Sequence, residues 1–156
     1  MISEDERKKP ADGGSNPSDP IRDYMGDCIF CKIAKGEIPA YKVYEDEEFM
    51  AILDINPVNP GHTLVIPKKH YRWVWDIPNI GDNFIFARKV AKALQKSMNT
   101  EWVVSDIAGT GVPHAHIHLV PRFENDGHEE FINPRLIKKI AKEEMEEIAK
   151  KIRESF

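Results

Sequence analysis

The chain has 156 residues, of which 41% are hydrophobic and 31% charged, with a formal net charge of −4 and two cysteines. This size and balance fit one globular domain with its own core, while the negative charge argues against nucleic-acid binding through a basic surface and two cysteines cannot build a disulfide framework. No apolar run is long enough to span a bilayer and no hydrophobic signal region opens the chain, so we expect a cytoplasmic protein without a nucleic-acid or membrane partner.

Residues 1–24 are rich in Pro, Gly, Ser, Asp and Lys, a composition that predicts a flexible N-terminal leader. Within this region, the segment 18–25 has a proline near its start, which favours a single helical turn. We expect one folded domain over residues 25–156.

Short runs rich in β-branched and aromatic residues predict strands over 42–46, 49–54, 62–67 and 101–106. Two longer segments, 81–98 and 134–155, repeat apolar residues at helical spacing and predict helices. Asn133 offers a cap and Pro134 a first-position proline for the second helix. Antiparallel strands with a central and a C-terminal helix make an α+β domain. The expected buried stripes are Ile85, Val90, Ala93, Leu94 and Met98 in the first helix and Ile137, Ile140, Ala141, Met145, Ile148 and Ile152 in the second.

The segment 109–119, GTGVPHAHIHL, alternates three histidines with apolar residues. Strict alternation predicts a half-buried strand with one apolar face and three imidazoles on the other face. Imidazole titrates close to neutral pH, and glycine-rich turns can direct backbone N–H groups at anions. The combination favours phosphate chemistry over a structural strand, because each buried ring needs a hydrogen-bond partner that a valine would not need.

A three-histidine metal site does not fit this strand. Residues two apart lie about 6.6 Å apart, so His114 and His118 would be separated by roughly 13 Å. Zinc–nitrogen bonds are only about 2.0–2.1 Å long. At most one or two of the three histidines are therefore expected to bind one metal ion.

The Cys28-x-x-Cys31 pair leaves three interpretations open. It can be a redox pair, part of a zinc site, or two small buried residues. A redox pair normally stands at the start of a helix in a parallel βαβ unit, and that setting is missing here. A structural zinc needs two further ligands.

These motifs, together with the segments 53–57 (LDINP) and 60–70 (PGHTLVIPKKH), closely resemble the histidine triad (HIT) superfamily of nucleotide hydrolases and transferases over residues 28–122. The resemblance implies a HIT-like fold with a nucleotide site on the sheet. His116 matches the histidine that attacks the α-phosphorus and carries a covalent nucleotidyl intermediate, a role that suits a neutral imidazole. His118 matches a residue that contacts phosphate or supports the site.

The resemblance also implies a substrate of the nucleoside phosphoramidate or dinucleoside polyphosphate type, with a purine base. Asp54 matches the carboxylate that accepts hydrogen bonds from the ribose, although an aspartate at this place can also cap a loop. At Thr110, at Gly111 and within 103–106 the chain lacks side-chain donors that many family members carry. The other positions that match nucleotide-binding residues are Ile29, Phe30, Ile52, Ile55, Gly109, Thr110, Gly111 and Val112.

In zinc-bearing HIT proteins the histidine after Pro-Lys-Lys and the first triad histidine complete a Cys₂His₂ set. The resemblance therefore implies a structural zinc held by Cys28, Cys31, His70 and His114. It also implies a homodimer with a sheet that continues across the interface. The two remaining histidines are expected to have no role in the site, His62 as a packed strand residue and His128 as a surface loop residue.

Three functions remain to be distinguished. The first is a nucleotidyl hydrolase or transferase that uses His116. The second is a nucleotide-binding scaffold or sensor with little catalysis, which the missing donors at Thr110 and Gly111 favour. The third is a zinc-dependent structural or interaction protein that binds no nucleotide.

Overall fold

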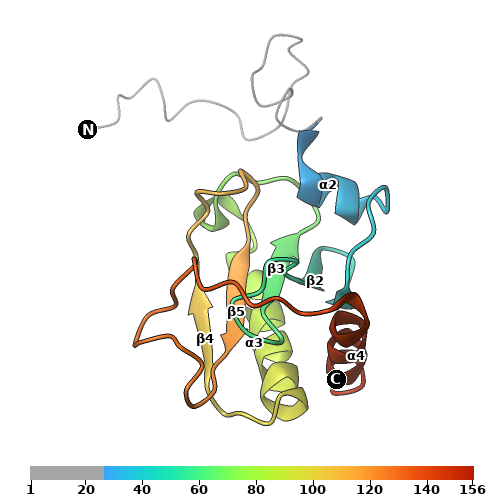
Figure 1. Ribbon diagram of the computed structural model, residues 1–156. Coiled ribbons are helices and arrows are strands. Elements are labelled where there is room, and N and C mark those ends of the chain that lie inside the picture. The colour runs from blue at the N-terminus through green and yellow to red at the C-terminus, as the bar shows by residue number, and fades with distance from the viewer. Residues whose placement is uncertain (1–26) are drawn as a thin grey trace, which may run out of the picture.

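Five strands form one antiparallel sheet in the order β1-β2-β3-β5-β4 in the computed structural model, which describes residues 27–156 (Figure 1). This architecture confirms the α+β class. The expectations of a leader over 1–24 and of a helical turn over 18–25 concern residues outside the described part of the chain. The strands are β1 (Lys42–Glu45), β2 (Phe49–Leu53), β3 (Thr63–Pro67), β4 (Val103–Asp106) and β5 (Ile117–Pro121).

Both faces of the sheet are covered, because β2 and β3 are buried at every position. Alternate side chains such as Ala51, Val65 and Ile117 pack toward the long helix α3 (Ile80–Ser97) and the C-terminal helix α4 (Lys142–Arg153). The intervening side chains pack toward the short helix α2 (Ile29–Ala34) on the other face, and these are Met50, Ile52, Leu64 and Ile66. Figure 1 shows α2 and α3 on opposite sides of the sheet.

The helix α3 agrees with the predicted range 81–98, but one residue of the predicted stripe is misplaced. Ile85 is 57% exposed, and its neighbour Phe86 is buried instead. The reason is the helical spacing, since a residue next to a buried position is turned by about 100° around the axis. The side chains that α3 buries are Asn83, Phe86, Ala87, Val90, Ala93 and Leu94.

The prediction of a helix from residue 134 is wrong, because α4 begins only at Lys142. Asn133 does cap a turn, since its Oδ1 accepts a hydrogen bond from the Arg135 amide at 3.0 Å. The helix does not continue from that turn, because the Lys138 amide donates to the Pro57 carbonyl of a distant loop at 2.7 Å. Residues 131–141, here called the crossing segment, instead pass in front of the sheet (Figure 1). In consequence Ile137 and Ala141 are exposed, whereas Met145, Ile148 and Ile152 are buried as predicted.

The histidine segment is only partly a strand, because β5 begins at Ile117. The predicted alternation is still present, since Ala115, Ile117 and Leu119 all belong to the core shared with α3. Within residues 27–156, none of the helices combines the length and the apolarity needed to cross a bilayer.

Candidate functional site

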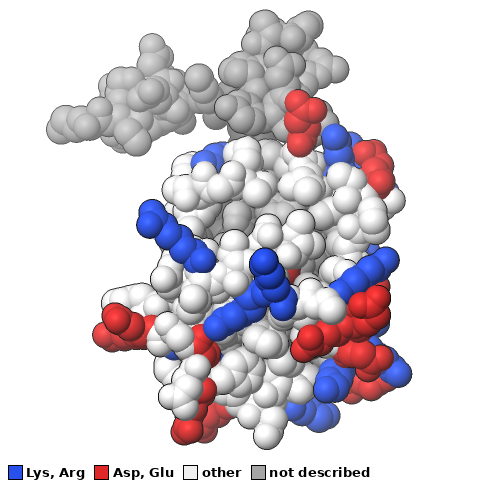
Figure 2. All heavy atoms as spheres, in the orientation of Figure 1, with Lys and Arg blue, Asp and Glu red and all other residues white. Residues whose placement is uncertain are grey.

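A cavity of about 610 Å³ lies on the sheet face that carries α2. Its size is within the usual range for a small-molecule site. Figure 2 shows a hollow between α2 and the crossing segment that is bordered mainly by uncharged residues, with Lys and Arg side chains standing over the crossing segment. The structure brings to this cavity every residue predicted as catalytic or nucleotide-binding, which are Ile29, Phe30, Ile52, Asp54, Ile55, Gly109, Thr110, Gly111, Val112, His116 and His118.

His116 lies in the cavity wall with one ring nitrogen fixed. Its Nδ1 lies 2.7 Å from the carbonyl oxygen of His114, and a carbonyl can only accept, so Nδ1 carries the proton. Nε2 therefore carries the free lone pair of the neutral ring. The ring forms a T-shaped contact with Phe30, whose ring centroid is 5.3 Å away. The neutral ring with this hydrogen bond has its lone pair on Nε2, in a side chain that lines the cavity beside one aromatic ring.

His118 is held by a histidine that was not expected in the site. His62 Nδ1 accepts a hydrogen bond from the Val58 amide at 3.2 Å, so the proton of its neutral ring is on Nε2. That Nε2 lies 2.8 Å from Nδ1 of His118, which must accept, and the proton of His118 is therefore on its Nε2. Two neighbouring rings in the cavity thus have complementary roles, with a lone pair on His116 and an N–H on His118.

Burial favours the neutral forms of His62 and His118. Burial lowers the pKa of His62 to about 4, although the nearby Asp54 carboxylate, 3.6 Å from its Nε2, works in the opposite direction. Burial also lowers the pKa of His118, and His116 beside it acts in the same direction. Asp54, His62 and His118 are close enough together to be considered as metal ligands. However, zinc ligands 2.0–2.1 Å from the ion stand about 3.4 Å apart, so the 2.8 Å between the two rings is a hydrogen bond.

Two parts of the wall come from features that the sequence prediction missed. His62 was expected to be only a packed strand residue. The crossing segment contributes Ile132, Pro134 and Ile137 to the cavity, where a helix was expected. The sequence signal for this segment is Asn133-Pro134 followed by apolar residues. The same pattern also fits the start of a helix, so it could not distinguish the two structures.

The loop around His128 attaches the crossing segment to the rest of the domain. His128 is half-buried rather than a surface residue, and both of its ring nitrogens are hydrogen-bonded, Nε2 to the Val58 carbonyl and Nδ1 to the Asn133 amide. Nearby, the buried Arg122 forms a bidentate ion pair with Asp126. These contacts fix the place of the crossing segment over the cavity.

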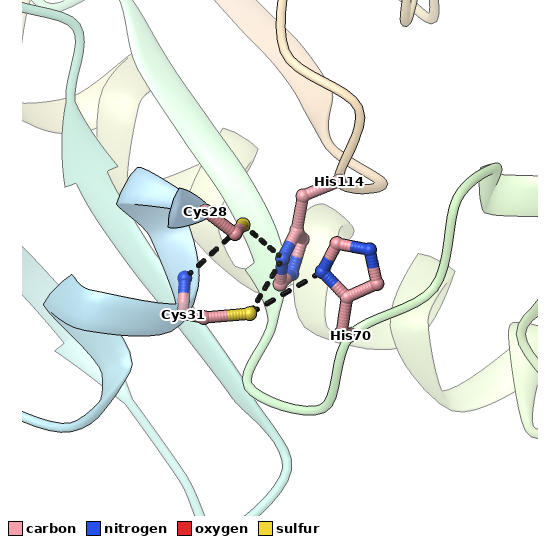
Figure 3. Close-up of side chains that lie close together, drawn as sticks. All are labelled: Cys28, Cys31, His70 and His114. Carbon is pink, nitrogen blue, oxygen red and sulfur yellow. Dashed lines mark hydrogen bonds between the residues drawn. The ribbon is translucent and has the colours of Figure 1, made fainter. Parts of the chain in front are cut away.

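A second cluster joins α2 to the histidine segment (Figure 3). Cys28 and Cys31 point from the N-terminal end of α2 toward His114, just before β5, and toward His70, which follows β3. Sγ of Cys28 lies 3.2 Å from Nδ1 of His114, and Sγ of Cys31 lies 3.3 Å from Nδ1 of His70. All four donor atoms lie within 4.8 Å of one another.

The donor set fits a tetrahedral zinc ion. Zn–S bonds of about 2.3 Å and Zn–N bonds of about 2.0–2.1 Å place sulfur and nitrogen about 3.6 Å apart at a tetrahedral angle, close to the distances in the cluster. Nε2 of His114 donates to the Pro67 carbonyl at 2.7 Å, which leaves Nδ1 free to bind metal. Burial lowers the pKa of His114 to about 4, so the ring is neutral. Burial and the neighbouring Cys28 raise the pKa of Cys31 to about 12, so its thiolate requires a nearby cation.

A family model described as HIT domain matches residues 35–125. A HIT-like protein of Methanocaldococcus jannaschii is 48% identical over 106 residues, which covers 64% of this chain and 82% of that protein. An adenosine 5'-monophosphoramidase of Saccharomyces cerevisiae is 42% identical over 100 residues, 61% of this chain and 62% of that protein. The structure of a zinc-bound histidine triad family protein from Mycobacterium smegmatis aligns with a TM-score of 0.67 and 32% identity, covering 84% of this chain and 94% of that chain.

Proposed function

This chain belongs to the HIT family, and on that premise we propose that it is a nucleotidyl hydrolase or transferase that acts through a covalent intermediate on His116. The observation that carries the proposal is the fixed ring of His116. Its Nδ1 is bonded to the His114 carbonyl and its Nε2 lone pair is free in a ligand-sized cavity. The yeast relative, an adenosine 5'-monophosphoramidase, indicates a nucleoside phosphoramidate as the first substrate to test.

The proposed reaction has two displacements at the α-phosphorus. Nε2 of His116 bonds to phosphorus while the bond from phosphorus to the leaving group breaks. Water then displaces the imidazole, which releases the nucleoside monophosphate and restores the neutral ring. Over the two steps, water supplies a hydroxyl group to phosphorus and a proton to the leaving group. The Nε2–H of His118 and the amides of the glycine loop 109–112 would stabilise charge on the phosphoryl oxygens, since these residues line the same cavity as His116.

The remaining cavity residues fit the parts of a nucleotide. Asp54 supplies a carboxylate that only accepts, as ribose hydroxyls require. Ile29, Phe30 and Ile52 supply an apolar wall of the kind that a purine base needs. The crossing segment also carries three cationic residues close in sequence to the lining residues Pro134 and Ile137, which would favour an anionic ligand, and they are Arg135, Lys138 and Lys139.

The substitution His116→Asn tests the proposal. The variant should bind AMP with close to wild-type affinity in calorimetry, because it keeps the cavity and the amide loop. It should show no turnover of adenosine 5'-phosphoramidate, because the nucleophile is missing. Full activity in a folded His116→Asn protein would refute the mechanism.

A nucleotide-binding scaffold or sensor is the second candidate. The observation that favours it is the lack of a side chain at Gly111 in a loop that lines the cavity, which leaves the phosphate to backbone amides alone at this position. Micromolar nucleotide binding by the wild-type protein, with no product after long incubation over a panel of nucleoside phosphoramidates and dinucleoside polyphosphates, would support this alternative.

We also propose a structural zinc at the Cys₂His₂ cluster. Its ligands would be Cys28, Cys31, His70 and His114. When bound, the ion would act as a structural cross-link between α2 and the residue two positions before His116. The fit of the four donors, and the zinc-bound state of the mycobacterial neighbour, support this assignment.

We further propose a homodimer in which two β4 strands meet. β4 is an edge strand that pairs only with β5 among the described strands, and an unpaired edge can accept another strand. Trp102, directly before β4, is 47% exposed. Light scattering should give a mass twice the 17.9 kDa of one chain, whereas a monomer at micromolar concentration would contradict the proposal.

A further inference from the structure

An arginine and a tryptophan outside the cavity support the glycine loop that lines it. Arg72 donates from Nη1 to the Gly109 carbonyl at 2.8 Å. Its guanidinium carbon lies 3.7 Å from the centroid of the Trp73 ring, a stacked cation–π contact. The same ring closely covers Gly109, where an added Cβ would stand 2.9 Å from it. Neither Arg72 nor Trp73 lines the cavity, so both act from behind the loop.

The direction of the Gly109 carbonyl determines the direction of the next amide. In a trans peptide, the C=O of one residue and the N–H of the following residue point in opposite directions, and there are no cis peptide bonds among the described residues. Since the Gly109 carbonyl points to Arg72, the Thr110 N–H points away from Arg72. Gly109 and Thr110 line the cavity and Arg72 does not, so we infer that the Thr110 N–H points toward the cavity.

The amides of this loop are available to a ligand. In the part of the chain from residue 27 onward, the N–H groups of Thr110, Gly111 and Val112 donate to no backbone carbonyl. Consecutive free N–H groups form a concavity that binds anions. Gly109 has a φ of +70°, a conformation in which glycine is favoured. A loop with two glycines needs an external contact to hold one conformation, and Arg72 and Trp73 provide it.

We propose that Arg72, stacked on Trp73, is a positioning residue that turns the Thr110 amide toward the phosphate of a bound nucleotide. The inference rests on the proposed function, because it assumes that a nucleotide occupies the cavity. The phosphate affinity of this chain would then depend on Arg72 and Trp73, which lie behind the loop and compensate for the absence of a side chain at Gly111. The contact preorganises the amides before the ligand arrives, so no reorganisation is needed on binding.

The test compares AMP with adenosine, because only AMP presents a phosphate to the loop. Calorimetry on the full chain should give the wild type a clear preference for AMP. Arg72→Met should reduce the affinity for AMP by roughly 10- to 100-fold, the size expected for lost hydrogen bonds to a charged group, and leave that for adenosine unchanged. Arg88→Met is the matched control, since it removes the charge of an exposed arginine on α3 outside the cavity lining and should behave as wild type.

A second variant separates positioning from charge. Trp73→Leu keeps the arginine but removes the stacking platform, so it should also reduce the preference for AMP. In amide NMR spectra, the Thr110 proton should shift downfield when AMP binds to the wild type and should shift less in both variants. A merely structural role would lower thermal stability without changing the ratio of the two affinities.

The possible outcomes have different consequences. An unchanged ratio of AMP to adenosine affinity in Arg72→Met overturns the inference and leaves the proposed function intact. A loss in Arg72→Met without any loss in Trp73→Leu also overturns it, because Arg72 would then act through its charge alone. If the wild type binds neither adenosine nor AMP, the proposed function fails and the inference fails with it.

Discussion

Replacing Asp126 by asparagine should strongly destabilise the fold, because this carboxylate is the buried partner of Arg122. The side chains of Arg122 and Asp126 are only 1% and 5% exposed. Oδ2 of Asp126 accepts hydrogen bonds from Arg122 Nε, the Asn59 side chain and the Phe123 amide. Oδ1 accepts from Arg122 Nη2 and the His128 amide. The carboxylate therefore connects β5, the loop before β3 and the base of the crossing segment.

The structure sets the size of the expected effect. In Asp126→Asn, one carboxylate oxygen becomes an NH₂ group that faces donors, and the buried guanidinium loses its counter-charge. Within residues 27–156, Arg122 forms an ion pair with no carboxylate other than Asp126, and its Nη1 is buried without a hydrogen-bond partner there. Breaking a buried ion pair by removing one partner typically costs about 3–5 kcal/mol. We expect a loss of this order in the free energy of unfolding at pH 7.

Urea unfolding monitored by circular dichroism measures this loss. Asp46→Asn is a matched control, since both backbone hydrogen bonds of Asp46, from Glu48 and Phe49, go to Oδ1 and an amide oxygen can keep them. The control should change the stability by less than about 0.5 kcal/mol. The contacts that hold the crossing segment should also loosen in Asp126→Asn. The affinity of this variant for AMP should therefore fall as well.

The effect should also depend on pH. The Arg122 guanidinium holds the pKa of Asp126 well below its ordinary value of 3.8. Since the folded-state pKa is lower than that of the unfolded chain, the ion pair stabilises the fold above about pH 4, and this stabilisation is lost as the pH falls toward the folded-state value. The difference between wild type and Asp126→Asn should therefore shrink below pH 4. A cost under about 1 kcal/mol at pH 7, or a difference that stays constant from pH 7 to pH 3, would refute the reasoning.

Three further predictions concern the zinc cluster, the glycine loop and the crossing segment. Cys31→Ser should bind less than one equivalent of zinc by metal analysis and unfold at least about 5 °C below the wild type; a full equivalent of zinc in this variant would contradict the assigned ligand set. Gly109→Ala should cost about 1–2 kcal/mol in thermal unfolding, because the residue has a positive φ and its Cβ would meet the Trp73 ring, and wild-type stability would show that the loop adopts another conformation. Ile137→Asp should raise KM for adenosine 5'-phosphoramidate severalfold with little change in stability, since this exposed residue lines the cavity; an unchanged KM would remove the crossing segment from the binding site.

The sequence predicted the strands and the central helix well, because their apolar periodicity is set by burial on one or two faces. The cavity residues were predicted for another reason, since motifs such as His-x-His-x-His and Pro-Gly-His-Thr resemble those of the HIT family, and that resemblance implied which positions bind a nucleotide. The antiparallel pairing of β3 with β5 places Leu64 opposite His118. No local sequence pattern could have predicted this register.

The errors arose where long-range contacts decide local structure. The helix expected from residue 134 stops after one turn because the Lys138 amide bonds to Pro57, 81 residues earlier in the chain. His62 was expected to be a packed strand residue because a single histidine before an apolar strand carries no signal of its own. Only the antiparallel pairing of β3 with β5 brings its ring to His118.

The central claim is that the free nitrogen of His116 becomes bonded to a nucleotide during turnover. Mass spectrometry of the intact protein, quenched in denaturant at alkaline pH while it turns over adenosine 5'-phosphoramidate, tests this claim directly, because the P–N bond of a nucleotidyl-histidine is hydrolysed in acid. A protein heavier by one adenylyl group, with peptide mapping to His116 and no adduct in His116→Asn, is the predicted result. Turnover without any adduct on the protein, or an adduct on another residue, would contradict it.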